Sequence, residues 1–155
     1  MPKLVAAKEQ LTARPSFRAK GDSSWHSVSA GSSEVMEFDV ADENVGGHFS
    51  TSTYKFKAPC FGTYMFSFNL YARLDSGQGD TTNYYWGYLQ LNGNNVGGQY
   101  IIGYQNGPDY DVGGSVSNLT LELKAGDLVN CGFNASGAAC SYYAGLCTFS
   151  GHLVG

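Results

Sequence analysis

The sequence predicts an all-β fold, on three observations. Glycine supplies 21 of the 155 residues, well above the usual share of about 7%, which favours frequent turns. Aromatic residues are as common as charged ones, at 14% each, and Tyr, Phe, Val and Thr suit pleated sheets. Short alternating apolar runs, spaced roughly 8–12 residues apart, indicate a jelly-roll β-sandwich of about ten strands.

The amino-terminal third is expected to hold two short strands between long polar segments. A turn or two of helix fits residues 1–13 at most, because Pro15 restricts the conformation of Arg14 before it. The first predicted strand begins at Phe17, and the second covers residues 35–38. The segments expected as loops are 21–33 and 39–52.

Period-two alternation is clearest in the middle of the chain. Apolar residues alternate with polar ones from Tyr54 to Ala58 and again from Tyr64 to Leu70. A loop over 75–82 separates this region from a strand over 84–91. Asn92-Gly93 then closes that strand with the strongest short hairpin signal.

The carboxyl-terminal third continues the pattern of strands and turns. A loop is expected over 105–115 and a turn over 124–127. The strands predicted around them are 100–104, 116–123, 129–133 and 146–153.

The length fits one domain, and the charge divides it into a basic arm, 1–14, and a sandwich domain, 15–155. Residues 1–20 hold five basic residues and one acid (+4), residues 21–155 hold four basic and twelve acidic (−8), and the total is −4. This charge pattern fits a solvated tail or an arm that docks on an acidic surface, such as a neighbouring subunit. The residues assigned to docking are Lys3, Lys8, Arg14, Arg18 and Lys20.

Several classes of protein do not fit the composition. No stretch approaches the roughly 18 apolar residues of a membrane-spanning helix, so no membrane insertion is expected. The first ten residues lack the apolar core of a secretory signal. No Gly-X-Y period indicates collagen, and a net charge of −4 does not favour nucleic acid as a partner.

One constellation of residues carries a family resemblance. Its eight positions are Phe38, Asn44, Phe49, Phe56, Gly62, Tyr64, Phe66 and Phe68. Their spacing resembles the signature of the complement C1q globular-head family. Residues 121–129 resemble the family's penultimate turn and strand, and 149–153, with Phe149 and Gly151, resemble its last strand. The resemblance covers about residues 15–155 and implies a C1q/TNF-like jelly roll.

The signature residues also have expected physical roles. Phe56, Phe66 and Phe68 share the core-facing parity of their strands. Gly62 allows a tight turn, and Gly151 allows close approach to a neighbouring strand.

The resemblance further implies a homotrimer that acts by binding rather than catalysis. A surplus of tyrosine suits buried interfaces, although these side chains could equally cover the sheets of one protomer. The tyrosines in question are Tyr84, Tyr85, Tyr88, Tyr142 and Tyr143.

A second, shorter resemblance concerns the segment 14–19, which is similar to the start of C1q-like modules in tailed-phage and other viral structural proteins. It implies a virion structural protein, either a trimeric capsid-decorating (cement) protein or a tail-fibre knob. Its partners would be major capsid or tail proteins, and its place the virion surface. The alternative is a secreted, extracellular animal C1q-like protein that recognises glycans.

Polar loops are the expected ligand-facing surface, suited to host-surface glycans. The residues assigned to it are Asp75, Gln78, Asp80, Gln105, Asn106 and Tyr110. Asp109 and Asp111 resemble the start of a calcium loop, although Gly113 replaces the third ligand of the EF-hand pattern. Solvated acids are the other interpretation of this pair and of the cluster Asp39, Asp42 and Glu43. No other cofactor is expected.

No catalytic motif is apparent, so the chain is not expected to be an enzyme. The cysteines are too far apart for a CxxC motif, and no histidine stands in a GxSxG or HExxH context. Buried, inert thiols are expected at Cys131 and Cys147, while secretion would permit three disulfide pairings of the four cysteines. Asn118 and Asn134 begin glycosylation sequons, which matter only if a eukaryote secretes the chain.

Overall fold

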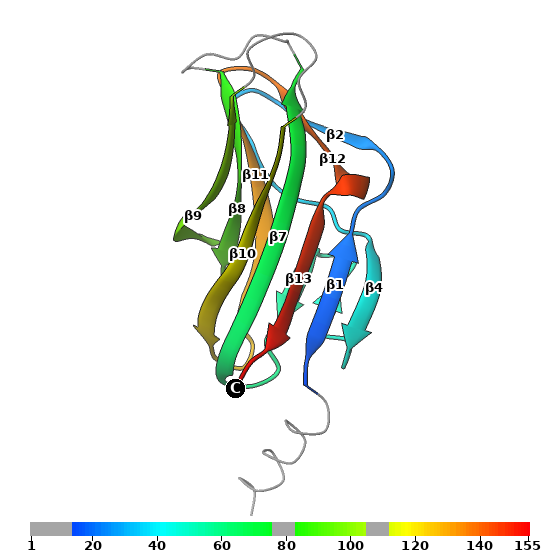
Figure 1. Cartoon of the computed structure of the whole chain (residues 1–155), viewed down its shortest axis with the longest axis vertical. Helices are drawn as coiled ribbons and strands as arrows, with labels where there is room; N and C mark the ends of the chain where they lie inside the picture. Colours follow the sequence, from blue (N-terminus) through cyan, green and yellow to red (C-terminus); the bar gives the residue numbers. More distant parts are fainter. Residues whose placement is uncertain (1–13, 76–82, 105–111) are drawn as a thin grey trace, which may run out of the picture.

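The predicted all-β fold is confirmed by the computed structural model, which describes residues 14–75, 83–104 and 112–155. Two antiparallel sheets pack face to face as a jelly roll (Figure 1). Over these residues the helical structure is one 3-10 turn, η1 (Ala144–Leu146). None of the described segments forms a helix with the length and hydropathy needed to span a bilayer.

The larger sheet has β7 at its centre. Its strands, in spatial order, are β2 (Trp25–Val28), β12 (Cys140–Tyr143), β7 (Gly62–Leu74), β13 (Thr148–Leu153), β1 (Ser16–Lys20) and β4 (Val40–Val45), with β10 (Val112–Leu123) also paired to β7. β10 runs along β7 on one side. On the other side, β13 pairs with residues 64–69 and β12 with residues 72–74.

The smaller sheet is centred on β11. Its strands, in order, are β5 (Phe49–Ser50), β6 (Lys55–Lys57), β11 (Leu128–Ser136), β8 (Tyr84–Leu91) and β9 (Asn94–Tyr104), with β3 (Ser33–Val35) paired to the far part of β11.

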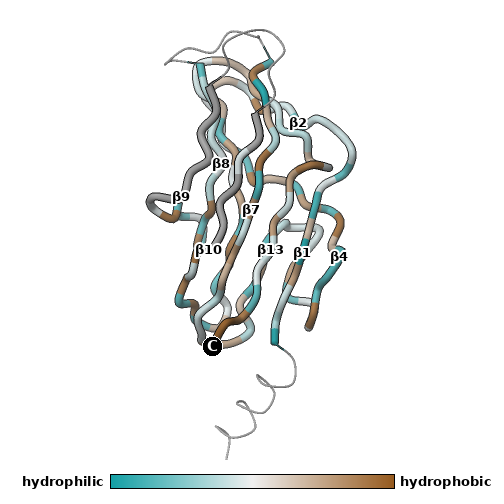
Figure 2. The backbone as a smooth tube through the Cα atoms, viewed as in Figure 1, coloured by the Kyte–Doolittle hydropathy of each residue, from teal (hydrophilic) through white to brown (hydrophobic). Residues whose placement is uncertain are grey.

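Burial along β7 alternates without a break from Gly62 to Leu74. Side chains of one parity face the second sheet, and those of the other parity face outward, as a period of two requires. Along β1 and β13, hydropathy alternates with this period of two (Figure 2). Phe56, Phe66 and Phe68 are all buried, which confirms their predicted core positions.

The core is organised around a glycine between two phenylalanines. Strand register places Phe17 of β1, Gly151 of β13 and Phe66 of β7 in one row across three strands. A Cβ atom at Gly151 would lie 2.5 Å from Cδ1 of Phe66 and 2.9 Å from Cε1 of Phe17. Gly151 was predicted to allow close approach to a neighbouring strand. The structure shows that two aromatic rings occupy the space next to this glycine.

Phe17 connects the two sheets. Its ring stacks on Phe49 and Phe56 of the smaller sheet, with centroids 4.8 Å and 5.0 Å away. It also meets Phe149 of the larger sheet edge-on at 4.8 Å. Phe38 is fully buried against Phe149, so aromatic residues brought together from distant parts of the chain form one cluster.

Two further signature residues have clear roles. The Asn44 side-chain amide donates to the carbonyl of Phe49 at 2.8 Å, and the N–H of Phe49 donates back to Asn44 Oδ1 at 3.0 Å. These bonds close the turn from β4 to β5. Gly62, by contrast, begins β7 and does not form the predicted tight turn; a Cβ there would lie 2.6 Å from Leu153 Cδ1. Close packing is thus the reason for glycine at this position.

The predicted hairpin at Asn92-Gly93 is confirmed. Both residues have positive φ, at 51° and 81°, as a type I′ turn requires. The Asn92 side chain donates to Asp127 Oδ1 at 3.0 Å and accepts from the N–H of Leu128 at 2.9 Å. It thereby ties this turn to the predicted turn at 124–127.

Several predicted loops are wrong because they contain edge strands. Segment 21–33 contains β2, and segment 39–52 contains β4 and β5. β4 is largely exposed, so it lacks the alternation that reveals half-buried strands. The predicted strand 35–38 contributes only Val35 to β3; residue 36 continues as extended chain whose N–H donates to Cys131 O at 2.9 Å.

The other element boundaries shift for a related reason. β9 begins at Asn94 and β10 at Val112, both earlier than expected, because Gly- and Asn-rich sequence continues the ladders past their apolar parts. β12 (Cys140–Tyr143), which was not predicted, continues the sheet beyond β13 along β7.

Three of the five candidate interface tyrosines are buried within the protomer, so the interface prediction is wrong for them. Tyr85 is in the core and its hydroxyl donates to Ala72 O at 3.0 Å. Tyr142 is also buried, and Tyr88 covers Gly132, where a Cβ would lie 2.4 Å from the ring. Tyr84 and Tyr143 are partly exposed.

Gly151→Ala tests the packing of the two rings. The added Cβ forces Phe66 and Phe17 apart, and overpacking of this kind costs about 1–3 kcal/mol of unfolding free energy. The matched control is Gly97→Ala, where a Cβ meets nothing within 4 Å, and a change below about 0.5 kcal/mol is expected. Urea denaturation of both variants makes the measurement; equal effects would contradict the packing role.

Candidate functional site

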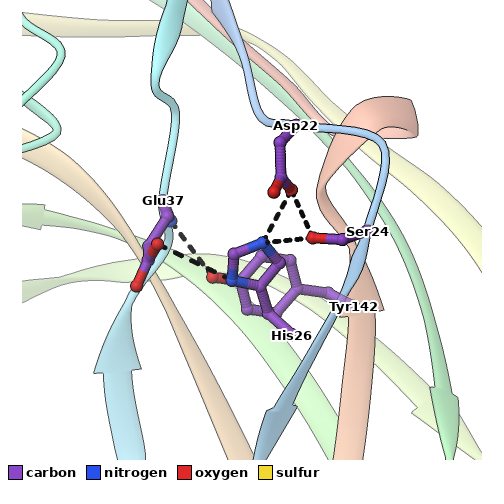
Figure 3. Close-up of polar contacts among 5 residues, drawn as sticks. All are labelled: Asp22, Ser24, His26, Glu37 and Tyr142. Atoms are coloured by element: carbon purple, nitrogen blue, oxygen red, sulfur yellow. Dashed lines mark hydrogen bonds and ion pairs between the residues drawn. The ribbon is translucent and has the colours of Figure 1, made fainter.

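A cluster of polar side chains lies at the β2 edge of the larger sheet, centred on His26. Its residues are Asp22, Ser24, His26, Glu37 and Tyr142 (Figure 3). His26 Nε2 lies 2.9 Å from Asp22 Oδ1 and 3.1 Å from Ser24 Oγ. Glu37 Oε2 lies 3.7 Å from the other ring nitrogen, Nδ1. The imidazole thus has a carboxylate on each side.

The cluster has the residue types of a hydrolase triad but not its geometry. A triad needs the acid on one imidazole nitrogen and the nucleophile alone on the other. Here Asp22 and Ser24 share Nε2, and the serine hydroxyl donates to Asp22 at 2.5 Å. The hydrogen bonds from Ser24 and then from His26 hold the pKa of Asp22 below its usual value. Ser24 is therefore a partner of the carboxylate and not an activated nucleophile.

Tyr142 ties this edge to the core. Its ring stacks on His26 with centroids 5.1 Å apart and planes 15° from parallel. Its buried hydroxyl accepts a hydrogen bond from the N–H of Glu37 at 3.1 Å. Burial raises the pKa of Tyr142 well above its usual value, so the phenol stays neutral even at strongly alkaline pH.

A second cluster, the aromatic–arginine patch, lies on the outer face of the same sheet. It consists of Trp25, Tyr71, Arg73 and Tyr143. The Arg73 guanidinium carbon lies 4.0 Å from the centre of the Trp25 ring system. Tyr143 meets Trp25 edge-on at 5.3 Å, and Tyr71 lies 6.1 Å from it. All four side chains are partly exposed.

Asp75, predicted to be ligand-facing, lies at the border of this patch. Its carboxylate accepts from the hydroxyls of Ser27 at 2.8 Å and Ser141 at 2.6 Å. Arg73 Nε is 3.9 Å from the same carboxylate. The other predicted ligand-facing residues, Gln78, Asp80, Gln105, Asn106 and Tyr110, lie outside the described residues.

The structure places Arg18 and Lys20, two of the residues assigned to docking, in the sandwich domain. Both belong to β1, and both pair with Asp42 of the same protomer, at 3.3 Å and 3.4 Å. Partial desolvation opposes the effect, but the bonds from these two cations hold the pKa of Asp42 below its usual value. Glu43 accepts a hydrogen bond from Ser16. Asp42, one of the three residues of the acidic cluster, is thus paired with two cations that were assigned to docking. Arg14 is exposed, and Lys3 and Lys8 lie outside the described residues.

The predicted calcium ligands Asp109 and Asp111 also lie outside the described residues. Elsewhere in the described chain, no group of three or more His, Cys, Asp and Glu side chains could hold a metal ion.

All four cysteines are free thiols. Cys131 and Cys147 are buried, as predicted, and Cys140 is buried as well. Burial raises the pKa of Cys131, raises that of Cys147 to about 11, and raises that of Cys140 to about 12. Cys60 alone is partly accessible.

These features define a two-sheet jelly-roll module, and the comparisons identify its family. The model of the C1q domain matches residues 17–154, so the chain belongs to the C1q family. The structure is similar to the globular domain of zebrafish complement 1qA protein, with a TM-score of 0.62 and 17% sequence identity over 92% of this chain and 98% of that one. This likeness concerns the fold. No curated protein matches the sequence.

Tyr142→Phe tests the tie between the histidine cluster and the core. The change leaves the N–H of Glu37 without its acceptor, so a loss of about 1 kcal/mol in unfolding free energy is expected. Tyr143→Phe, one residue along the same strand, is the matched control and should change stability by less than about 0.5 kcal/mol. Thermal and urea unfolding supply both values. Equal unfolding free energies for the two variants would contradict this role of the Tyr142 hydroxyl.

Thiol accessibility tests the burial of the cysteines. Only Cys60 should react with Ellman's reagent in the native protein, because a thiol must reach solvent as thiolate to react. All four should react in denaturant. Two or more fast native thiols, or fewer than four after unfolding without reductant, would contradict this arrangement.

Proposed function

We propose that the chain is a non-enzymatic structural and recognition subunit of a tailed-phage virion, a homotrimer that decorates the capsid or tips a fibre. The C1q domain is a recognition and structural fold, and such domains commonly form trimers. The observation that carries the proposal is the polarity of the domain. Its first strand starts at the same end as the carboxyl terminus, whereas β7 ends at the opposite end, beside β12 (Figure 1).

That polarity suits a tethered module. The segment before β1 attaches at one end, and the other end presents Asp75 and the aromatic–arginine patch. We propose that Lys3, Lys8 and Arg14 contact an acidic surface on a capsid or tail protein, since opposite charges favour docking. Arg14 is exposed, as this role requires.

The outer face of the larger sheet is the proposed trimer interface. Over residues 63–69 of β7 and 148–150 of β13, the outward residues are small or uncharged: Thr63, Met65, Ser67, Asn69, Thr148 and Ser150. Tyr71, Arg73 and His152 lie beyond this part of the face. Interface cores are depleted in charge, and the nearby charges on β1 and β4 already pair with one another. Leu146, 52% exposed, stands beside this face, where its carbonyl accepts from Asn69.

The cysteines support assembly in a reducing compartment. Four free thiols, three of them buried, suit a protein made and assembled in a cytoplasm rather than exported through an oxidising one. The secreted animal protein remains the competing function. The two functions make different predictions for Asn134, the first residue of a glycosylation sequon. Its side chain is partly exposed and donates to Ser33 Oγ at 2.6 Å.

Mass spectrometry of material from the natural source separates them. The virion function predicts unmodified chains in the purified particle fraction. Chains in a secreted fluid, with glycan on Asn134 or with disulfides, would overturn it in favour of the extracellular alternative.

Ser67→Arg tests the trimer face. Three arginines brought together there should dissociate the trimer, because burying unpaired charge is costly. Ser136→Arg, on the outer side of the smaller sheet, is the matched control and should remain trimeric. Light scattering after gel filtration gives the mass, and circular dichroism verifies folding. A folded Ser67→Arg trimer, or a monomeric wild type, would contradict the proposal.

A further inference from the structure

We propose that the aromatic–arginine patch binds a carboxylate-bearing sugar, with Arg73 as the contact for the carboxylate. The inference rests on the proposed role of the chain as a recognition module. It names both a site and the chemical class of its ligand.

The position of Arg73 is fixed from two sides. The Trp25 ring lies 4.0 Å below the guanidinium carbon, which orients the plane of the group and partly desolvates it. Asp75 lies 3.9 Å from Nε, so the Nε side faces this carboxylate. Within the described residues, no second acidic group lies in salt-bridge range of Arg73. As far as the described residues go, the edge formed by its two terminal nitrogens therefore remains for a ligand.

A carboxylate suits that edge best. Two parallel N–H donors of a guanidinium match the two oxygens of one carboxylate. The pair with Asp75 lies near the limit of an ion pair, and the Arg73 side chain is 43% exposed. A ligand carboxylate at the usual ~2.8 Å of a charge-assisted bond would be the stronger partner.

Two hydrogen bonds hold the Asp75 carboxylate in place, so it does not move onto the terminal nitrogens of Arg73 that the ligand would use. The hydroxyls of Ser27 and Ser141 both donate to it. Ser27 is exposed, and a hydroxyl that donates one bond can still accept another. Ser27 Oγ is thus placed to accept from a sugar hydroxyl beside the bound carboxylate.

The aromatic residues favour a sugar over a simple anion or a polyanion. Trp25, Tyr71 and Tyr143 form a partly exposed apolar surface around the guanidinium, on which the C–H face of a pyranose can pack. The site holds one cation beside an acid, in a chain of net charge −4. A single carboxylate on an otherwise neutral ring fits this balance, whereas a chain of phosphates or sulfates does not.

Tryptophan fluorescence gives a direct assay, since the chain has two tryptophans. In Trp86→Phe, Trp25 is the remaining emitter. Methyl β-D-glucuronoside should change its emission saturably, and methyl β-D-glucoside, which lacks the carboxylate, should bind at least tenfold more weakly. The methyl glycoside of N-acetylneuraminic acid, tested alongside, distinguishes a sialic acid from a hexuronic acid as the preferred source of the carboxylate.

Substitution of Arg73 in the Trp86→Phe background identifies the contact. Arg73→Gln should lower affinity at least tenfold, and Arg73→Lys should do nearly the same, because lysine keeps the charge but lacks the planar fork. Arg18→Gln, an exposed arginine on β1 paired with Asp42, is the matched control and should bind normally. Circular dichroism excludes misfolding as the cause.

Three results would overturn the inference: no saturable response to either acidic glycoside, equal binding of the neutral glucoside, or equal loss in Arg18→Gln. The mass of each sample in solution is measured in parallel. A trimer that binds no acidic sugar would refute this site and leave the proposed assembly intact. A monomer that binds an acidic sugar would support this site and refute the proposed assembly.

Discussion

The structure depends on how two phenylalanine rings share the space above one glycine. Phe17, Gly151 and Phe66 stand in register on three neighbouring strands. The missing side chain at Gly151 lets both rings occupy the middle of the sheet. Phe17 then reaches across to Phe49 and Phe56, so this one row fixes the register of the larger sheet and its distance from the smaller one.

Glycine has the same use elsewhere in the sandwich. At Gly87 of β8, an added Cβ would meet Cζ of Phe68 at 2.7 Å, so a ring from one sheet fits into the backbone of the other. High glycine and high aromatic content are thus two aspects of one packing scheme. Core packing is completed by these rings, and the proposed assembly and recognition surfaces use outward side chains of β2, β7, β12 and β13.

The sequence predicted the parts of the fold that have a period of two, and missed those that do not. β7 alternates and was predicted closely, and β8 was predicted from the Asn92-Gly93 hairpin that ends it. Edge strands β2 and β4 instead resemble loops because solvent faces much of their surface. The histidine cluster shows the limit for sites. Asp22, Ser24 and His26 are close in sequence. Pairing of β12 with β2 brings Tyr142 beside His26, and Glu37 joins the cluster through its hydrogen bond to Tyr142. The aromatic–arginine patch likewise joins β2, β7 and β12, and loop composition indicated only Asp75, at its border.

The central claim is that the uncharged part of the outer face of the larger sheet, along residues 63–69 of β7 and 148–150 of β13, holds the protomers together while the end bearing Asp75 faces the ligand. A crystal structure of the purified chain tests it most directly, because it records which face each protomer buries. We expect a threefold assembly with Ser67 of β7 and Ser150 of β13 at the interface and Arg73 accessible to solvent. A trimer built through the smaller sheet, or one that covers Arg73, would contradict the account.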